Sequence, residues 1–359
     1  MGNEGFTVTE AIRICEWYEK NKRSFPWRDT GNPYDVWLSE IMLQQTRIEV
    51  VRRRFLQFKE ELPDVQAVSQ CEDDRLMRLW EGMGYYSRAR NLKKCAQALM
   101  KDYNGVFPRN ETLLKKLPGI GPYTAGAIAS ICFDLAVPAV DGNVLRVVHR
   151  LLAIPDDVRD PSSVKNAQNM LRPVLGDEKI KAGTLSQALM ELGEVICLPN
   201  GSPLCEQCPW RDSCRAHLEN LTDRIPFRSA NKKRTVQERT VLVIRDGSRF
   251  LMNKRGESGL LAGLYEFYGI EAFINEKEAL EEVRRLGLSP LRIRALPDSK
   301  HIFTHREWHM KAFEIMVEDA SGFHGDSLFL VTKKELESLA VPSAFRVYTD
   351  WYALRGESF

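Results

Sequence analysis

The chain lacks an apolar run long enough to cross a lipid bilayer. Its longest apolar stretch, residues 125–133, ends at Asp134, whereas a membrane-spanning helix needs about 20 predominantly apolar residues. The N-terminal residues also lack a basic segment followed by an apolar one, so we expect no signal peptide. The chain also lacks a large excess of one charge, because it has 51 Lys and Arg residues and 49 Asp and Glu residues. Bulk charge therefore neither requires nor excludes nucleic acid, and we expect an intracellular protein without membrane contact.

The chain does contain enough material for several hydrophobic cores. Its length of 359 residues suggests two or three domains. A content of 43% hydrophobic and 28% charged residues is ordinary for a globular protein. Because the interior of a cell disfavours disulfides, its cysteines are candidates for packing or for metal binding.

Four cysteines, Cys197, Cys205, Cys208 and Cys214, crowd into one segment with the spacing C-x7-C-x2-C-x5-C. The segment is rich in proline, so it cannot build a regular apolar core of its own. Four thiolates at this density can hold either zinc or an iron–sulfur cluster. The competing interpretation is four ordinary buried cysteines, and the central C-x2-C pair argues against it.

Apolar residues recur at helical spacing up to about residue 196, as in Trp37, Leu38 and Ile41. We predict an all-helical region at residues 1–222, which includes the cysteine segment. Asn32 followed by a proline predicts a helix start. A capping box at residues 46–49 predicts another helix, beginning at Arg47.

A change of character follows the helical region. Residues 223–239 are polar and basic without periodicity, and we interpret them as a linker. Residues 240–359 combine strand-like alternation with one short amphipathic helix. We therefore predict a multidomain chain whose second domain is α+β.

A glycine-rich turn separates two predicted helices at residues 116–122. Gly119 and Gly121 let the backbone turn where a Cβ atom would clash. The amides of Gly119, Ile120 and Gly121, near a helix N-terminus, suit a phosphate oxygen. The turn thus predicts a helix-hairpin-helix element that binds the DNA backbone without reading sequence. The alternative is a purely structural corner between helices.

Two carboxylates occupy contrasting environments. Asp141 precedes an amphipathic helix at its N-cap, where backbone N–H groups favour the ionised form. Glu40 lies among apolar residues of another predicted helix, which raises the pKa of a carboxyl group. Carboxylates with separated pKa values suit acid-assisted cleavage of a glycosidic bond. The plainer interpretations are an ordinary N-cap and a solvated helix position.

Together these elements resemble the endonuclease III superfamily of base-excision DNA glycosylases, and within it the adenine DNA glycosylases of the MutY type. The resemblance implies a [4Fe-4S] cluster bound by Cys197, Cys205, Cys208 and Cys214. The first cysteine gap spans seven residues where the family usually has six, so the pattern supports Cys197 least. The matching stretches are residues 26–28, 37–46, 80–88, 117–124 and 139–143 and the cysteine segment.

The resemblance also implies a mechanism. The target adenine leaves the duplex for a pocket, Glu40 protonates it at N7, and ionised Asp141 stabilises the cationic sugar before water completes hydrolysis. Tyr123 and Asn143 are expected to hydrogen-bond near these carboxylates. Bifunctional relatives carry Lys at the position of Tyr123, and a phenol cannot form a Schiff base. We therefore predict a monofunctional glycosylase.

Further residues are assigned to the substrate by the same resemblance. Arg28 and Gln187 align with adenine contacts, although Gln187 also fits an exposed helix position. Gln45 and Thr46 lie in a polar loop that can enter the base stack. Tyr85 can wedge beside the opposite base, and core packing is the alternative for it.

The α+β region resembles the Nudix-like domain of the same proteins. Residues 259–267 carry the likeness, whereas residues 278–285 do not supply the Glu-rich order of a working Nudix hydrolase. We therefore predict recognition without pyrophosphatase activity. Phe303, Thr304 and His305 match the family's Phe-Ser-His element, which recognises 8-oxoguanine, and Thr304 keeps a hydroxyl group.

These features predict an enzyme that excises adenine paired with 8-oxoguanine or guanine in double-stranded DNA and so starts base excision repair. We expect a monomer, located in the cytoplasm at the nucleoid if the source is bacterial. Three alternatives stay open. Tyr123 argues against an oxidised-pyrimidine glycosylase, Glu40 and Asp141 argue against a non-catalytic iron–sulfur protein that binds damaged DNA, and the missing Nudix order argues against a nucleotide pyrophosphatase.

Overall fold

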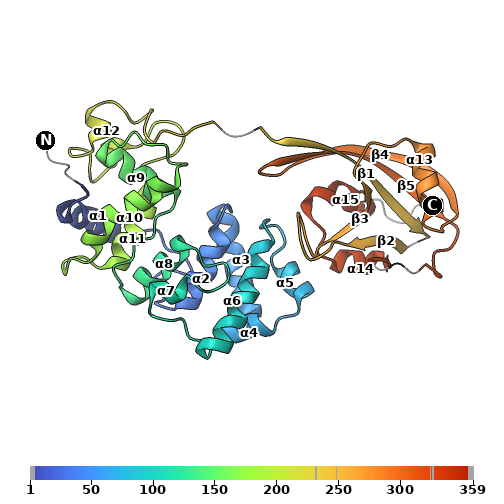
Figure 1. Ribbon diagram of the computed structural model, residues 1–359, viewed down its shortest axis with the longest axis horizontal. Coiled ribbons are helices and arrows are strands. Elements are labelled where there is room, and N and C mark those ends of the chain that lie inside the picture. Colours follow the sequence, from blue (N-terminus) through green and yellow to red (C-terminus); the bar gives the residue numbers. More distant parts are fainter. Residues whose placement is uncertain (1–4, 231–232, 248, 324, 326, 355–359) are drawn as a thin grey trace. The chain divides into compact units, whose positions relative to one another are not determined.

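The computed structural model describes residues 5–230, 233–247, 249–323, 325 and 327–354, which form two compact units (Figure 1). The first unit contains the described residues up to Cys71 together with Arg90–Ala230. The second contains Glu72–Ala89 and the described residues from 233 onward. The predicted fold class, an all-α region followed by an α+β region, is confirmed.

The first unit is built from helices around an apolar core. Ile14, Leu145, Leu171 and Leu189, from four different helices, are all buried in this core. The elements are α1 (Val8–Asn21), α2 (Pro33–Leu43), α3 (Ile48–Glu61), α4 (Val65–Gln70), α6 (Ser87–Tyr103, which begins in the second unit), α7 (Glu111–Leu114), α8 (Pro122–Phe133), α9 (Gly142–Leu152), α10 (Pro161–Leu175), α11 (Ala182–Val195), the short 3-10 turn η1 (Cys205–Gln207) and α12 (Arg215–Leu218).

One of the two predicted helix starts is confirmed and the other is wrong. Asn32 caps α2, with its side chain accepting a hydrogen bond from the Tyr34 amide and proline in the first turn. α3 begins at Ile48 and not at Arg47, and its N-cap makes no side-chain hydrogen bond. The cause lies in the preceding loop, where Gln45 adopts a left-handed φ of 56° and the Thr46 hydroxyl bonds to a loop carbonyl.

The second unit is a six-stranded mixed sheet with the order β4-β5-β1-β3-β2-β6. β1 pairs parallel with β5, and the other pairings are antiparallel. Side chains alternate between the faces of β1, so Val243 packs in one core and Ile244 in the other. The elements are α5 (Asp73–Leu79), β1 (Thr235–Asp246), β2 (Arg249–Lys254), β3 (Tyr265–Ile270), α13 (Glu276–Arg285), β4 (Pro290–Ile302), β5 (Arg306–Val317), β6 (Leu328–Thr332), α14 (Lys333–Ser338), the 3-10 turn η2 (Ser343–Phe345) and α15 (Arg346–Leu354).

The predicted linker at residues 223–239 is too long at both ends. β1 begins at Thr235, where it pairs with the start of β5. Upstream, Phe227 forms a bridge with Asp157 and accepts a hydrogen bond from the Val158 amide, so this part belongs to the first unit. The prediction also placed all residues before 223 together, whereas Glu72–Ala89 belongs to the second unit.

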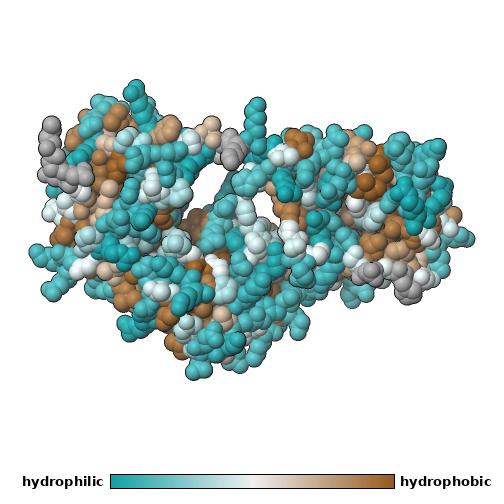
Figure 2. Space-filling view, viewed as in Figure 1, coloured by the Kyte–Doolittle hydropathy of each residue, from teal (hydrophilic) through white to brown (hydrophobic). Residues whose placement is uncertain are grey.

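Apolar side chains are mostly enclosed in these cores. On the face seen in Figure 2, hydrophilic residues cover most of the surface and hydrophobic ones form small separate patches. In the part of the chain that the structure describes, no helix has the length and apolar character needed to cross a bilayer.

Close packing of α9 against α11 depends on one glycine. A Cβ atom built on Gly193 would lie 2.7 Å from the Cβ atom of Asn143 and 3.2 Å from its Cα atom. Real Cβ atoms do not approach another carbon that closely, so any side chain would push the two helices apart. The end of α11 is therefore held directly against the start of α9.

We expect Gly193→Ala to lower the free energy of unfolding by about 1–3 kcal/mol, because overpacking forces helix displacement. Urea unfolding followed by circular dichroism measures this loss. Gly176→Ala is the matched control, since its Cβ atom would meet neighbours only at 3.5 Å or more. An unfolding midpoint for Gly193→Ala equal to that of the control would contradict the packing explanation.

Candidate active site

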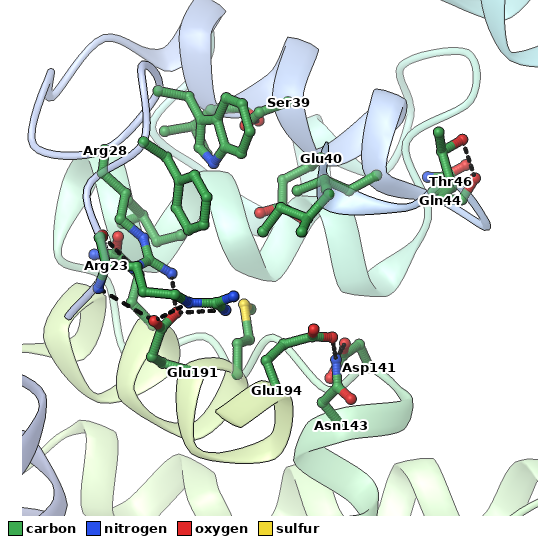
Figure 3. A pocket seen from close by; sticks show the side chains of 18 of the residues that line it. Arg23, Arg28, Ser39, Glu40, Gln44, Thr46, Asp141, Asn143, Glu191 and Glu194 are labelled. Carbon is green, nitrogen blue, oxygen red and sulfur yellow. Dashed lines mark hydrogen bonds and ion pairs between the residues drawn. The ribbon is translucent and has the colours of Figure 1, made fainter. Parts of the chain in front are cut away.

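The first unit contains a cavity of about 590 Å³ between α2, α8, α9 and α11. Figure 3 shows Glu40 projecting into it from α2, with Asp141, Asn143 and Glu194 on the facing wall. The predicted residues that line this cavity are Arg28, Glu40, Gln45, Thr46, Tyr123, Asp141, Asn143 and Gln187.

Glu40 is 8% exposed. Burial raises its pKa to about 7, against the opposing effect of a hydrogen bond from Tyr123, and the nearby Asp141 charge raises it further. The Tyr123 hydroxyl donates to Glu40 Oε2 at 2.5 Å. Burial first, and then the Glu40 charge, raise the pKa of Tyr123. Glu40 is thus a carboxyl group that can carry a proton near neutral pH.

Asp141 caps α9 as predicted. Its Oδ1 accepts the Val144 amide at 2.8 Å, and its Oδ2 accepts Asn143 Nδ2 at 3.0 Å. Burial raises the pKa of Asp141, while these donors and the charge of Arg146 oppose that rise. Glu40 accepts the Tyr123 hydroxyl, whereas Asp141 accepts N–H groups at a helix N-terminus, which favour the ionised form of its carboxyl group.

Asn143 is held at every polar atom of its side chain. Its Nδ2 donates to Asp141 Oδ2 and to Glu194 Oε1, at 3.0 and 2.9 Å. Its Oδ1 accepts Arg146 Nη2 at 2.8 Å. The amide orientation is therefore fixed by charges on both of its sides.

Arg28 is oriented by a buried carboxylate. Glu191, on α11, has a side chain only 1% exposed and accepts Arg28 Nη2 at 2.5 Å and Arg23 Nε at 2.6 Å. Burial alone would raise its pKa, but the hydrogen bonds from Arg23 and Arg28 lower the pKa of Glu191 overall. The Arg28 guanidinium also lies over the rings of Tyr18 and Phe25. A planar donor is thus presented to the cavity in one orientation.

The other predicted adenine and base-stack residues are less constrained. Gln187 is half-buried, and its Nε2 donates to the Gly183 carbonyl of its own helix at 3.2 Å. Gln45 and Thr46 lie in the loop after α2, at the edge of the same cavity. Their predicted substrate roles stay predictions.

The predicted hairpin lies between α7 and α8. Gly119 has a φ of 75°, and Gly121 is the N-cap of α8. Ile120 is buried and so anchors the turn in the protein interior, while Gly121 is exposed. The loop therefore has the form that the sequence predicts, with an exposed backbone at the start of a helix.

The second unit brings together Tyr85 and Thr304, which lie 219 residues apart in the chain and whose hydroxyls hydrogen-bond to one another. Tyr85 is 45% exposed and adopts a left-handed φ of 47°, so core packing does not describe it. Phe303 packs edge-on against Trp308, and His305 is exposed beside it in the chain.

The four clustered cysteines line one small cavity together with Arg150 and His217. Arg150 Nη1 donates to Cys197 Sγ at 3.3 Å, and Arg146 Nε donates to the Cys197 carbonyl at 2.8 Å. Among the residues that the structure describes, no group of three or more His, Cys, Asp or Glu side chains meets the distances for a single metal ion.

Sequence reasoning missed Arg23, Arg146, Glu191 and Glu194. The available signal was the placement of Glu191 inside an otherwise apolar helical stretch, where an unpaired carboxylate is costly and a cationic partner is required. Glu194 had no such signal, because an exposed Glu near a helix end is common. Only the three-dimensional structure shows that it faces Asn143.

Comparison with known protein families agrees with this geometry. Residues 38–173 match the family described as HhH-GPD superfamily base excision DNA repair protein, and residues 240–350 match the NUDIX domain. A solved thermostable thymine-DNA glycosylase is 25% identical with a TM-score of 0.52, covering 59% of this chain and 96% of that one. A solved endonuclease III–DNA complex, 23% identical with a TM-score of 0.51 over 60% of this chain and 99% of its own, supports the fold alone.

Three relatives extend the similarity over both units. Adenine DNA glycosylase from Mus musculus is 31% identical, covering 94% of this chain and 77% of its own length. The Homo sapiens enzyme is 32% identical over 93% of this chain and 73% of its own. The enzyme from Buchnera aphidicola subsp. Baizongia pistaciae (strain Bp) is 31% identical over 88% of both chains. With this extent of similarity and this site, the chain belongs to the adenine DNA glycosylase family.

Proposed function

We propose that this protein is a monofunctional DNA N-glycosylase that removes adenine paired with 8-oxoguanine, or with guanine, from double-stranded DNA and so starts base excision repair. The observation that carries the proposal is the pairing, across one cavity, of Glu40, whose pKa is raised to about 7, with Asp141, whose carboxylate accepts N–H donors at a helix N-terminus. Acid-assisted cleavage of a glycosidic bond needs one carboxyl group that keeps its proton and one that is stabilised as an anion.

The chemistry follows from these positions. Protonated Glu40 gives its proton to adenine N7, the bond between C1′ and N9 breaks, and its electron pair leaves with the base. Asp141, facing the sugar, stabilises the positive charge that develops at C1′. Water then bonds to C1′ and loses a proton to complete hydrolysis. Tyr123 stays bonded to Glu40 and offers no amine, so no Schiff base forms.

Base recognition is assigned to two places. In the cavity, the fixed Arg28 guanidinium supplies donors for the acceptor edge of a flipped adenine. In the second unit, the paired hydroxyls of Tyr85 and Thr304 form an exposed polar group suited to the base opposite the adenine. The hairpin amides at Gly119–Gly121 would hold the DNA backbone. We further propose a monomer that works at the DNA inside the cell.

The cysteine cavity suits a [4Fe-4S] cluster. Four thiols face one space, and the neighbouring Arg150 guanidinium donates a hydrogen bond to Cys197 Sγ. Cys197, Cys205, Cys208 and Cys214 would hold the cluster, whose contribution is structural with respect to base excision. The choice of iron over zinc rests on the family resemblance.

A single-turnover assay tests the substrate. We expect adenine release from a duplex with adenine opposite 8-oxoguanine, slower release opposite guanine, and none from adenine opposite thymine or from an oxidised pyrimidine opposite guanine. Strand breakage should follow only after added alkali, because position 123 is a tyrosine and offers no lysine amine for a Schiff base. Duplex binding without release of any base, by folded protein, would support instead a non-catalytic protein that binds damaged DNA.

The rate of base excision should be constant at acidic pH and fall as pH rises through about 7. Only the protonated form of Glu40 is an acid, and a raised pKa means that this form is lost near neutrality. Glu40→Gln should reduce excision by about 10²–10⁴-fold while leaving duplex binding intact. Single-turnover rates across pH measure both effects. A rate that keeps rising above pH 8 would show that Glu40 is not the acid.

Protein purified without oxygen should contain about four iron and four sulfide per chain, as the cluster formula requires. Cys208→Ser should lose most of this iron, whereas Cys15→Ser, outside the cysteine segment, should retain it. Metal analysis decides between an iron–sulfur cluster and zinc, and stoichiometric zinc without sulfide would overturn the cluster assignment.

A further inference from the structure

The cavity contains one carboxylate to which the mechanism above gives no role. Glu194 lies in the last turn of α11 and is exposed at the cavity wall beside Asn143 (Figure 3). A negative charge at this end of a helix faces the negative end of the helix dipole. α11 also has no basic residue in its last turn to compensate.

The contact with Asn143 accounts for that position. An amide nitrogen has two protons, and those of Asn143 are shared between Asp141 Oδ2 and Glu194 Oε1. Rotating the amide by half a turn would place its oxygen against two carboxylates and its N–H groups against Arg146. Glu194 therefore helps to set which edge of Asn143 reaches Asp141.

The same contact needs the close approach of α11 to α9. Gly193, the residue before Glu194, lies against Asn143 where a Cβ atom would not fit. The Gly193 carbonyl also accepts Arg146 Nη2 at 2.8 Å. Glu194 is thus carried on a backbone segment that is fixed from two directions and not on a free helix end.

Glu194 also changes the charge balance of the cavity. Arg23 and Arg28 are already paired with Glu191, so they do not neutralise Glu194. Burial, Glu40 and Asp141 raise the pKa of Tyr123 most, and Glu194 adds to that rise. Its field therefore reaches the group that bonds Glu40. The charged or titratable groups around it are Asp141 and Arg146 near α9, Tyr123 on α8, Glu40 on α2, Glu191 on α11, and Arg23 and Arg28 in the segment before α2.

We infer that Glu194 is a positioning residue for base excision. It holds Asn143 against Asp141, and its negative charge favours the positive charge that develops on the sugar. The inference deepens the proposed adenine excision and rests on it. In the part of the chain that the structure describes, the Glu194 side chain accepts a hydrogen bond from Asn143 and forms no ion pair that would give it another structural function.

Two substitutions separate the hydrogen bond from the charge. Glu194→Gln keeps an oxygen that can accept from Asn143 but removes the charge, and we expect excision to slow by about 2-fold to 5-fold. Glu194→Ala removes both, and we expect a loss of about 10-fold or more. Glu178→Gln removes a charge from an exposed residue outside the cavity and serves as the control.

The pH profile distinguishes this role from general destabilisation. The hydrogen bond from Asn143 lowers the pKa of Asp141. In Glu194→Ala, where Asn143 loses its contact with Glu194, excision should therefore slow at the acidic end of the range. Glu194→Gln and Glu178→Gln should keep the native pH profile. Single-turnover excision opposite 8-oxoguanine from pH 5.5 to 9 measures it, together with duplex affinity and the thermal unfolding midpoint of each protein.

The outcomes separate the two proposals. Native rates and an unmoved pH profile in both Glu194 variants would overturn the positioning role while leaving adenine excision intact. A slower rate explained by a lowered unfolding midpoint, with the profile unmoved, would also overturn it. If the unsubstituted protein releases no adenine, the failure lies with the proposed function itself.

Discussion

The guanidinium of Arg146 is the contact on which the arrangement of the first unit depends. It donates to the Cys197 carbonyl, to the Gly193 carbonyl and to Asn143 Oδ1, each at 2.8 Å. These acceptors come from the cysteine segment, from the end of α11 and from the start of α9. One buried cation thus joins the wall that carries Asp141 to the loop that would hold a cluster. Because each acceptor lies in a different segment, none of the three can shift without costing a charged hydrogen bond.

Burial and hydrogen bonding act on the two cavity carboxylates in different proportions. Glu40 is enclosed by apolar side chains and receives one phenolic hydroxyl, so desolvation dominates. Asp141 is half-buried and sits where a helix begins, and N–H donors compensate for the lost solvent. Two carboxyl groups in one cavity are therefore stabilised in different ways. Position relative to a helix terminus decides which of them receives backbone N–H donors.

Features encoded in neighbouring residues were predictable from the sequence. The cap at Asn32, the turn at Gly119 and the N-cap position of Asp141 each depend on a few adjacent residues, and the structure has all three. The box at residues 46–49 fails although it too is local, because Gln45 is left-handed and the Thr46 hydroxyl bonds to the Gln44 carbonyl.

Features that depend on distant residues were not predictable in this way. Nothing near Glu191 indicates that Arg23 and Arg28 arrive from the far end of the chain. The assignment of Glu72–Ala89 to the second unit rests on contacts such as Tyr265 to Asp74, 191 residues apart. Spacing and periodicity describe a segment but not its partner, so the linker boundaries were misplaced for the same reason.

The second unit is discontinuous in sequence, which bears on how the protein can be dissected. Its contiguous portion after residue 233 leaves out α5 and the loop of Tyr85. A fragment cut at the linker would expose Thr304 without its hydroxyl partner and would leave Tyr265 and Lys254 without Asp74. The complementary fragment would carry residues 72–89 without the sheet that they belong to. To express the second unit by itself, the gene must therefore be permuted or grafted so that residues 72–89 stay with the sheet.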